Sequence, residues 1–330
     1  MAGMILGTGS YLPDFVLKND DFTSFIETSD EWIHSHTGIS ERRINTGLAN
    51  WEMGERAARQ AMSSAGLGPD DIDMLIVSTG TPDFFTPSTA CVLQGRLGIA
   101  QGFAFDISAA CSGFLYALDM ADSYIRCGKA RNVLLVAAET LSRVTDFNDR
   151  NTCVLFADGA AAVVYGETPE GSGLLSSYLS SRGELWDIIV ADAFKTRNVF
   201  DEEHRFTGGN QLADNPGIHW NGHEVYKFAT RVVPAMLDEV CERARTKIDD
   251  VKLFFFHQAN ERIIRTVIEK YNLVKERCVM AIERTGNISS ATIPYMLDMA
   301  SRDGRLKRGE LIAMCGFGAG MTAGAALMRW

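Results

Sequence analysis

The sequence predicts a layered α/β fold, and two kinds of segment support this prediction. Short apolar runs rich in β-branched residues have the length of strands buried on both faces; the clearest are residues 74–77, 133–137, 161–164 and 253–256. Amphipathic stretches between such runs, for example 53–65 and 232–247, indicate helices. Alternation of strands with helices is typical of α/β proteins.

Two stretches of the chain resemble each other, which favours an internal duplication. Residues 53–77 run from an amphipathic helix through an Asp-Asp-Ile sequence into an apolar strand, and residues 233–256 do the same through Asp-Asp-Val. Two unrelated αβ units would give a similar pattern, but a repeat is the better explanation. We therefore predict two halves, 1–172 and 173–330.

Composition and charge exclude several classes of protein. The 330 residues are 46% hydrophobic and 22% charged, which excludes a disordered chain. A net charge of −10 argues against a protein that binds nucleic acid or lies on an anionic membrane. The sequence has no run of about 18 apolar residues, so we expect no membrane span.

Cysteine usage points to a reducing compartment. The seven cysteines form no C-x-x-C pair, which argues against a disulfide framework and against a zinc site. The N-terminus has neither the basic segment nor the long apolar run of a signal peptide. We expect a cytoplasmic protein without a metal.

One stretch, residues 180–223, shows little periodicity. It contains His204, His219 and His223 together with two tryptophans. Irregular segments of this length in compact domains are usually functional loops. We therefore expect this stretch near the mouth of a site.

Cys111 is the first candidate for chemistry. A predicted strand, 103–107, leads through small residues into a helix with apolar residues at Phe114, Leu115 and Leu118. Cys111 then lies at the start of that helix, where unpaired N–H groups and the helix dipole favour a thiolate. This position predicts a lowered pKa and a nucleophilic sulfur. The alternative is a buried structural cysteine.

Three further segments carry polar or glycine-rich candidates. His257 follows the apolar run 253–256, at the end of a strand where α/β folds place their sites. Asn287 follows Gly286 in a turn, where asparagine often serves backbone geometry alone. The glycine-rich segment 316–320 allows backbone amides to face a ligand oxygen.

A cysteine, a histidine, an asparagine and a glycine-rich amide donor in this order form a specific combination. On these residues the whole chain resembles β-ketoacyl-acyl-carrier-protein synthase III, a thiolase-fold condensing enzyme. The matching segments are Thr28-Ser29-Asp30-Glu31-Trp32-Ile33, Thr37-Gly38-Ile39 with Arg42-Arg43, Ala109-Ala110-Cys111-Ser112-Gly113-Phe114, His257-Gln258-Ala259-Asn260 and Gly286-Asn287. The resemblance implies duplicated βαβαβαββ halves that form a five-layered α-β-α-β-α core. The first half would carry the cysteine, and the second the histidine and the asparagine.

The resemblance also implies a reaction: a decarboxylative condensation of acyl-coenzyme A with malonyl-acyl-carrier-protein in fatty acid biosynthesis, without a cofactor. Cys111 would take the acyl group. His257 and Asn287 would bind the thioester oxygen of the enolate that decarboxylation forms, and the backbone N–H groups of Cys111 and Ala319 would form a second oxyanion hole. Donors placed where charge develops stabilise the transition state more than the ground state.

The resemblance assigns coenzyme A to Trp32, Arg150 and His36. Trp32 and Arg150 match residues that stack on the adenine, while His36 stands where the family commonly has arginine. A neutral imidazole binds a diphosphate less strongly than a permanent cation. Thr86 matches the residue that closes the acyl pocket of the partner subunit in the family's homodimer. Acetyl-preferring members often carry phenylalanine there, so Thr86 predicts tolerance of medium-chain primers.

Acidic carrier protein needs a local basic surface on an acidic enzyme. The resemblance assigns Lys227, Arg262 and Lys270 to docking, and Arg265 recurs at helical spacing among them. The predicted contact also includes Gln258, Ala259, Asn260 and Glu261. A solvated helix face is the alternative.

Several other readings stay open at this point. A thiolase would need a second catalytic cysteine, for which Cys315 is the candidate. Plant-type polyketide synthases share the three residues but are longer, and a related condensing enzyme of a polyketide, quinolone or similar specialised pathway would look much the same. A non-catalytic acyl-binding homologue would be expected to lose Cys111, His257 or Asn287. A papain-like protease also uses cysteine, histidine and asparagine, but its secreted, disulfide-bearing pattern is absent.

Overall fold

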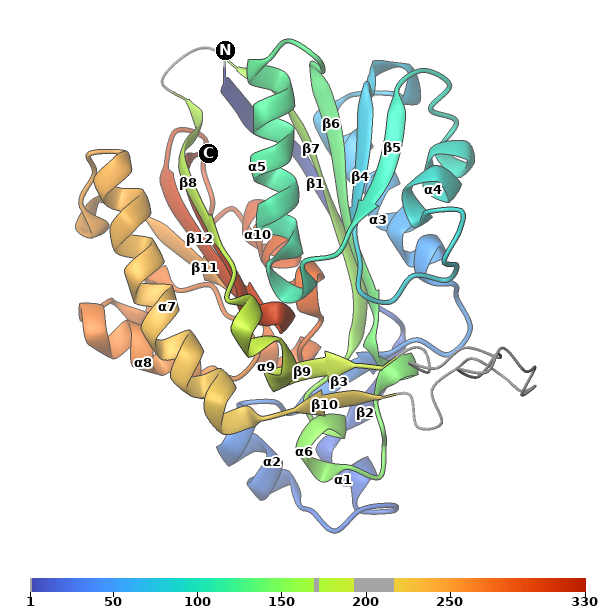
Figure 1. The fold of residues 1–330 in the computed structure, drawn as a ribbon, viewed down its shortest axis with the longest axis vertical. Helices are drawn as coiled ribbons and strands as arrows, with labels where there is room; N and C mark the ends of the chain where they lie inside the picture. The colour runs from blue at the N-terminus through green and yellow to red at the C-terminus, as the bar shows by residue number, and fades with distance from the viewer. Residues whose placement is uncertain (1, 169–171, 193–216) are drawn as a thin grey trace, which may run out of the picture.

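Figure 1 shows the computed structural model of the chain, which describes residues 2–168, 172–192 and 217–330. The strands are β1 Ala2–Tyr11, β2 Phe15–Lys18, β3 Glu41–Ile44, β4 Met74–Ser78, β5 Phe103–Ile107, β6 Asn132–Thr140, β7 Asp158–Thr168, β8 Gly173–Ser180, β9 Ile189–Ala191, β10 Ile218–Trp220, β11 Leu253–Phe256, β12 Leu311–Gly318 and β13 Thr322–Arg329. The helices are α1 Asn19–Phe22, α2 Asp30–Thr37, α3 Asn50–Ala65, α4 Thr89–Leu97, α5 Gly113–Arg126, α6 Arg150–Cys153, α7 Gly222–Arg243, α8 Glu261–Tyr271, α9 Ile282–Thr285 and α10 Thr292–Arg302.

The long strands form two sheets that follow the same plan. The first has the order β1-β7-β6-β4-β5, and the second has the order β8-β13-β12-β11. In both sheets two antiparallel pairings are followed by a parallel one. In the first sheet β5 then adds parallel to β4, whereas in the second a single parallel bridge joins Phe254 to Cys278 at the same place. The repeat is the predicted βαβαβαββ unit, with one strand of the second copy reduced to this bridge.

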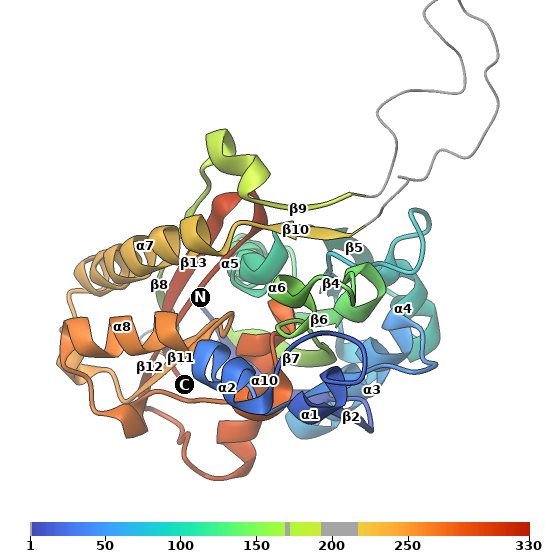
Figure 2. The same ribbon diagram turned by 90° about the horizontal axis from the view of Figure 1, so that it is seen from below.

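Helices fill three layers around the sheets. α5 and α10 lie between the two sheets, α3 and α4 cover the outer face of the first sheet, and α7 and α8 cover the outer face of the second (Figures 1 and 2). The central layer contributes to an apolar core: Phe114 of α5 and Met296 of α10 pack with Ile76 and Met314 from the two sheets. The predicted five-layered α-β-α-β-α core is therefore confirmed.

The predicted elements form, with one displaced boundary. The four predicted strands lie within β4, β6, β7 and β11, and the helix predicted over 53–65 lies within α3. The helix predicted over 232–247 was placed too late, because α7 begins ten residues earlier. The Asn221 side chain accepts the backbone N–H of Glu224 at 3.2 Å and so caps this earlier start. The helix ends before Arg245, whose φ of 51° is left-handed.

A smaller group of elements, α1, α2, β2, β3 and α6, lies at one end of the sheets (Figure 1). Arg42 of β3 holds it together from a fully buried position. Its guanidinium donates to the carbonyl of Leu17 at 3.2 Å, to Asn19 Oδ1 at 2.8 Å and to the carbonyl of Val154 at 2.7 Å. Burial lowers the pKa of Arg42 to about 10, so the side chain stays charged at neutral pH. This anchor ties β2 and the start of α1 to the segment that follows α6.

Within the described ranges, no helix is both long and apolar enough to cross a bilayer.

Candidate active site

Cys111 lies where β5 turns into α5, as predicted. The turn is a short 3-10 helix, Ala110–Ser112, and Ala110 has a φ of 46°, a left-handed conformation that few side chains adopt. Gly113 begins α5, where a Cβ atom would overlap Ser78 Oγ. Strain of this kind persists only where packing over-determines the backbone, and it is common at active sites.

The Cys111 side chain lines a cavity of 240 Å³. The polar side chains of its wall are Thr81, Ser108, Glu139 and Ser289, and Ala319 also lines it. The larger apolar side chains of the wall are Leu141, Val144, Phe156, Ile189, Ile218 and Trp220. An apolar cavity with few polar groups suits a ligand with a hydrocarbon chain and one reactive polar end.

Burial, rather than the helix N-terminus, sets the acidity of this thiol. Removal from water and, to a smaller extent, the carboxylate of Glu139 raise the pKa of Cys111 to about 12, although a hydrogen bond with Ser289 lowers it. The predicted low pKa is therefore wrong, because desolvation of the sulfur outweighs the dipole. Cys111 is a protonated thiol at neutral pH and needs a proton acceptor when it attacks.

His257 follows β11 directly and is held by the second sheet. Its backbone N–H donates to the carbonyl of Cys315 at 2.8 Å, and its ring meets Phe317 edge-on with 5.4 Å between ring centroids. The residue is only 2% exposed, and burial lowers the pKa of the imidazole to about 3. The ring is therefore neutral. Among the described residues, neither ring nitrogen has a hydrogen-bond partner.

Asn287 uses one end of its amide for the turn and leaves the other end free. Its backbone pairs with the segment after α6: the N–H donates to the carbonyl of Leu155 at 2.9 Å, and its carbonyl accepts from Ala157 at 3.0 Å. Oδ1 accepts the backbone N–H of Ser289 at 2.9 Å. The buried Nδ2 has no partner in the part of the chain that the structure describes.

Unpartnered buried nitrogens at His257 and Asn287 are a strong sign of a ligand site. Buried polar groups are almost always hydrogen-bonded, and an unsatisfied one costs about 1–3 kcal/mol. Both side chains hold donors away from water. They are suited to an oxygen atom that a ligand brings.

The turns that carry these residues pack against one another. Turn 110–112 contacts turn 289–291, which follows Asn287, and it also contacts the end of β12, the strand that pairs with β11 and so supports His257. The three predicted residues, from three distant parts of the sequence, are thus mounted on elements in direct contact.

Ala319 lies beside Cys111, as the predicted second oxyanion hole requires. Both residues line the same cavity. A Cβ atom on Gly318 would lie 2.5 Å from the backbone N of Cys111, so the two chain segments touch at the backbone. The left-handed φ values of this turn, 71° and 45°, fall on Gly320 and Met321 and not on Ala319. The methyl group of Ala319 therefore brings no backbone strain.

Sequence reasoning missed Glu139 and Ser289 as residues of this site. Glu139 is a fully buried carboxylate near the end of β6, in a run that is otherwise apolar. A lone acid in a buried strand is a usable signal, because charged residues are rarely buried without a function. Ser289 follows Asn287 by two residues and has a φ of 50°.

Trp32, His36 and Arg150 come together at one end of a second pocket. Trp32 and His36 line this pocket of 520 Å³, and the Arg150 guanidinium lies 4.5 Å from the Trp32 ring centroid. The His36 ring stacks on Trp32 with 4.5 Å between centroids. Trp220 lines both this pocket and the Cys111 cavity, so the two spaces are neighbours.

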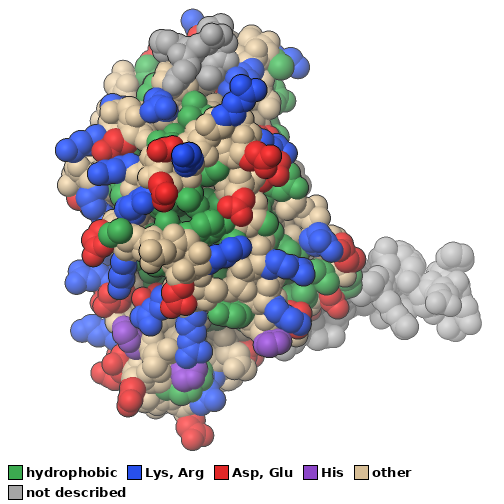
Figure 3. Space-filling model, turned by 90° about the vertical axis from the view of Figure 1, so that its left-hand side faces the viewer, with side chains coloured by type: hydrophobic (Ala, Val, Ile, Leu, Met, Phe, Trp, Pro, Cys, Tyr) green, Lys and Arg blue, Asp and Glu red, His purple; other side chains and the backbone are tan. Residues whose placement is uncertain are grey.

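The predicted carrier-protein residues divide into exposed and buried groups. Lys227, Arg262, Arg265 and Lys270 are exposed on α7 and α8, and Figure 3 shows basic side chains on this face with acidic ones among them. Acids partly neutralise them, since Lys227 pairs with Glu224 at 3.2 Å and Arg265 pairs with Glu261 at 3.0 Å.

The other predicted carrier-protein residues make structural contacts within the chain. Gln258 and Ala259 are buried, and Gln258 Oε1 accepts the N–H groups of Ala281 and Ile282 at 2.8 and 2.7 Å. Asn260 caps α8 and donates to the carbonyl of His36 at 2.9 Å. Gln258 and Ala259 therefore position the segment and present no side chain to a partner at the surface.

Thr86 lies outside the Cys111 cavity of its own chain. It lines an adjoining open pocket of 830 Å³, which shares four residues with that cavity: Gly80, Thr81, Ser108 and Val144.

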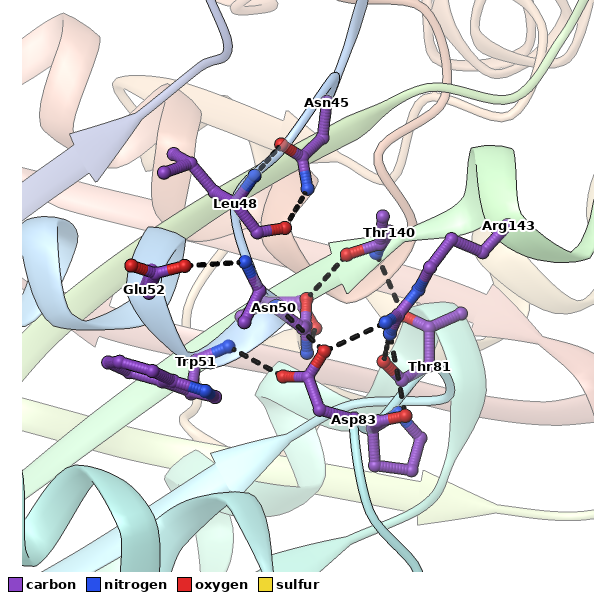
Figure 4. A network of polar contacts seen from close by, with 12 residues as sticks. Asn45, Leu48, Asn50, Trp51, Glu52, Thr81, Asp83, Thr140 and Arg143 are labelled. Carbon is purple, nitrogen blue, oxygen red and sulfur yellow. Dashed lines mark hydrogen bonds and ion pairs between the residues drawn. The ribbon is translucent and has the colours of Figure 1, made fainter.

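A polar network fixes the segment that leads to Thr86 (Figure 4). The carboxylate of Asp83 accepts the backbone N–H groups of Asn50 and Trp51, both at 3.0 Å, and pairs with Arg143 at 2.8 Å. Asp83 thereby caps the start of α3, where a negative charge is stabilising. The contacts of Asp83 therefore fix the segment that forms the pocket wall at Thr86.

The stretch 180–223 contributes to the site through its described ends. Ile189 and Ala191 of β9, with Ile218 and Trp220 of β10, line the Cys111 cavity. The prediction that this stretch lies near the site is confirmed for these ends. His204 and the rest of 193–216 lie outside the described residues.

Cys315 gives no support to a thiolase. It is completely buried in β12, where its Sγ contacts the carbonyl of Val233 at 3.8 Å, and burial raises its pKa. It packs with the core formed by α7, α8 and the second sheet. It lies on the outer face of that sheet, away from α5.

Comparison with known proteins agrees with this geometry. Models of the 3-oxoacyl-[acyl-carrier-protein] synthase III family match residues 105–183 and, for its C-terminal part, 241–330. The β-ketoacyl-[acyl-carrier-protein] synthase III of Aquifex aeolicus is 43% identical over 100% of both chains, and that of Clostridium perfringens is 41% identical over 98% of both.

Solved structures extend the likeness to the whole fold. The crystal structure of the Aquifex aeolicus enzyme superposes with a TM-score of 0.91 over 99% of this chain and 100% of that one. The priming β-ketosynthase of the R1128 polyketide pathway is 31% identical, with a TM-score of 0.91 over 99% of this chain and 96% of that one. The chain therefore belongs to the thiolase-fold 3-oxoacyl-[acyl-carrier-protein] synthase III family.

Proposed function

We propose that this chain condenses an acyl primer from acyl-coenzyme A with malonyl-acyl-carrier-protein, as a 3-oxoacyl-[acyl-carrier-protein] synthase III of fatty acid biosynthesis. The single observation that carries the proposal is the pair of buried, unpartnered donors at His257 and Asn287 beside the turn of Cys111. A thioester enolate is the kind of ligand that needs two neutral donors on one oxygen.

In the first half of the reaction, Cys111 Sγ attacks the carbonyl carbon of acyl-coenzyme A. The backbone N–H groups of Cys111 and Ala319 stabilise the oxyanion of the tetrahedral intermediate. The bond from carbon to the coenzyme A sulfur breaks, and coenzyme A leaves with a proton. The primer remains as a thioester on Cys111, with its chain in the apolar cavity.

In the second half, the malonyl thioester oxygen binds to His257 and Asn287. The bond to the malonyl carboxylate breaks, carbon dioxide leaves, and the electron pair forms an enolate on that oxygen. The enolate carbon attacks the acyl carbonyl on Cys111, and the carbon–sulfur bond breaks. The product is a 3-oxoacyl carrier protein two carbons longer, and the released thiolate takes up a proton.

Mass spectrometry of the intact protein tests the proposal. Mixing the protein with acyl-coenzyme A is expected to add one acyl group to Cys111, and later addition of malonyl-carrier-protein should remove it and yield 3-oxoacyl-carrier-protein. A Cys111→Ala variant is the control and should gain no mass. If the unchanged protein gains no acyl group at any primer length, an acyl-binding protein becomes the better description.

Coenzyme A is proposed to enter through the 520 Å³ pocket beside Trp32. The adenine would insert between Trp32 and Arg150, which now rests on the ring. His36 would lie beside the path of the diphosphate, where it is a weaker ligand for phosphate oxygens than an arginine. Its Nδ1 lies 2.7 Å from the carbonyl of Trp32, which only accepts, so Nδ1 carries a hydrogen and is already used as a donor within the chain.

His36→Arg is therefore expected to lower the KM for acyl-coenzyme A by about two- to fivefold, the worth of one partly exposed ion pair. Arginine adds a permanent charge and a forked donor for phosphate oxygens. Steady-state kinetics with varied acyl-coenzyme A measure the change, and the KM for malonyl-carrier-protein serves as the control. An unchanged or higher KM for acyl-coenzyme A would count against this binding mode.

Further parts of the proposal concern partners. The exposed cations Lys227, Arg262, Arg265 and Lys270 would dock the acidic carrier protein.

Two copies would form a homodimer in which Thr86 reaches the acyl cavity of the partner. The exposed aromatic rings of Phe84 and Phe85, at 50% and 73% exposure, support a contact there. The small Thr86 side chain favours medium-chain primers. All seven cysteines are free, which supports a cytoplasmic location.

A further inference from the structure

Glu139 is a buried carboxylate that the reaction outlined above does not use. It is fully inaccessible to water, and the structure gives it no ion pair within the described ranges. Four donors hold it instead. Oε2 accepts from Gly80 N at 3.0 Å and Thr81 Oγ1 at 2.9 Å, and Oε1 accepts from Ser289 Oγ at 3.1 Å and Ser290 Oγ at 2.8 Å. Burying such a charge is costly, so its retention calls for a function.

The position of Ser289 connects this carboxylate to the nucleophile. Ser289, Glu139 and Cys111 line one cavity. The Ser289 hydroxyl donates to Glu139 Oε1 at 3.1 Å, and it lines the same cavity wall as Cys111, whose pKa it lowers. A hydroxyl both donates and accepts, so it can pass a proton between the two groups. Ser290 contacts the same carboxylate oxygen but does not line the cavity.

We propose that Glu139 accepts the Cys111 proton through the Ser289 hydroxyl as the thiol attacks acyl-coenzyme A, and that it returns the proton by the same route to the departing coenzyme A thiolate. This inference rests on the proposed function. The carbon–sulfur bond to Cys111 forms as its S–H bond breaks, and the carbon–sulfur bond to coenzyme A breaks as a new S–H bond forms. The charge of the enzyme is the same at the start and the end of the step.

The surroundings of each group favour this assignment. Cys111 is a thiol in the free protein and needs an acceptor, while His257, which has no hydrogen-bond partner among the described residues, has the proposed role of binding the malonyl oxygen. Burial also raises the pKa of Glu139, which makes it a better base than an exposed carboxylate. Transfer within the cavity leaves one negative charge in place throughout, so the site avoids the cost of a second buried anion.

The test compares Ser289→Ala with Ser290→Ala. Acylation of Cys111 by acyl-coenzyme A alone is followed by rapid quenching and intact mass. Ser289→Ala is expected to slow it by about 100-fold or more, the usual worth of a general base. Ser290→Ala removes a hydrogen bond to the same carboxylate oxygen but leaves the Ser289 hydroxyl in place, and should slow acylation far less than Ser289→Ala does. Equal losses in both variants would overturn the relay in favour of a scaffold role.

A second measurement separates proton transfer from positioning of Asn287. In a Cys111→Ala background the protein is expected to decarboxylate malonyl-carrier-protein with His257 and Asn287, and adding Ser289→Ala should lower that rate far less than it lowers acylation. The backbone N–H that holds Asn287 is present in both variants. A fall in decarboxylation as large as the fall in acylation would show that Ser289 acts by fixing the turn, and would overturn the relay. If the unchanged protein is never acylated, the proposed function fails and the relay fails with it.

Discussion

Replacing His257 or Asn287 by alanine is expected to lower malonyl decarboxylation, and with it condensation, by about 100- to 1,000-fold, the worth of one oxyanion-hole donor. The effect should be large because both groups are buried and neutral, and their donors meet no partner in the described part of the free protein. Release of labelled carbon dioxide from malonyl-carrier-protein measures the step.

Acylation of Cys111 is the control for these two variants. The first half of the reaction uses backbone donors at Cys111 and Ala319, so the His257→Ala and Asn287→Ala proteins should still gain an acyl group from acyl-coenzyme A at close to the normal rate. Loss of both half-reactions together would mean that the substitution disturbs the whole site, and would remove the support for separate roles. Asn287→Asp adds a matched test, because it keeps the Oδ1 acceptor for Ser289 and loses the Nδ2 donor.

Gly318→Ala is expected to slow acylation of Cys111, the step that the His257 and Asn287 variants should leave nearly unchanged. Its new Cβ atom would lie 2.5 Å from the backbone N of Cys111 and 2.9 Å from the Cβ of Ala110, and neither neighbour is the end of a flexible side chain. The turn of Cys111 must therefore move. Since a displacement of about 1 Å can cost about 100-fold in rate, acylation should fall by that factor.

Gly316→Ala provides the control for this substitution. Gly316 lies in the same strand, two residues earlier, and a Cβ atom there would meet its nearest neighbours, Ile293 and Leu115, at an ordinary 3.4 Å. It should acylate nearly normally. The rate of Cys111 acylation, by quenched-flow mass analysis, compares the two. If Gly318→Ala acylates as fast as Gly316→Ala, the backbone N–H of Cys111 is not a donor to the intermediate.

The sequence predicted the strands, the central helix and the place of Cys111 at its start because their signals are local. A run such as 253–256 is apolar throughout, so both the strand β11 and the place of His257 after it follow from neighbouring residues. The start of α7 was missed because its cap, Asn221, belongs to an irregular stretch in which no helical spacing of apolar residues predicts a helix.

Features that depend on distant contacts could not be predicted in this way. The pKa of Cys111 is set by how fully the folded chain excludes water, and a helix N-terminus in the sequence says nothing about that. The bond between Ser289 and Glu139 joins residues 150 positions apart. Gln258 was predicted to belong to the docking surface, yet its side-chain amide is turned inward to hold Ala281 and Ile282.

The repeated plan of the two sheets has a consequence for the number of reactive centres. In one copy Ala110, with a φ of 46°, precedes Cys111 and α5; in the other Ser289, with a φ of 50°, precedes Ser290 and α10. Ser290 thus takes the place of the sulfur nucleophile, but its hydroxyl is tied to Glu139. The same position of the repeat therefore holds the sulfur proposed to attack in the first copy, and a hydroxyl that supports the site in the second.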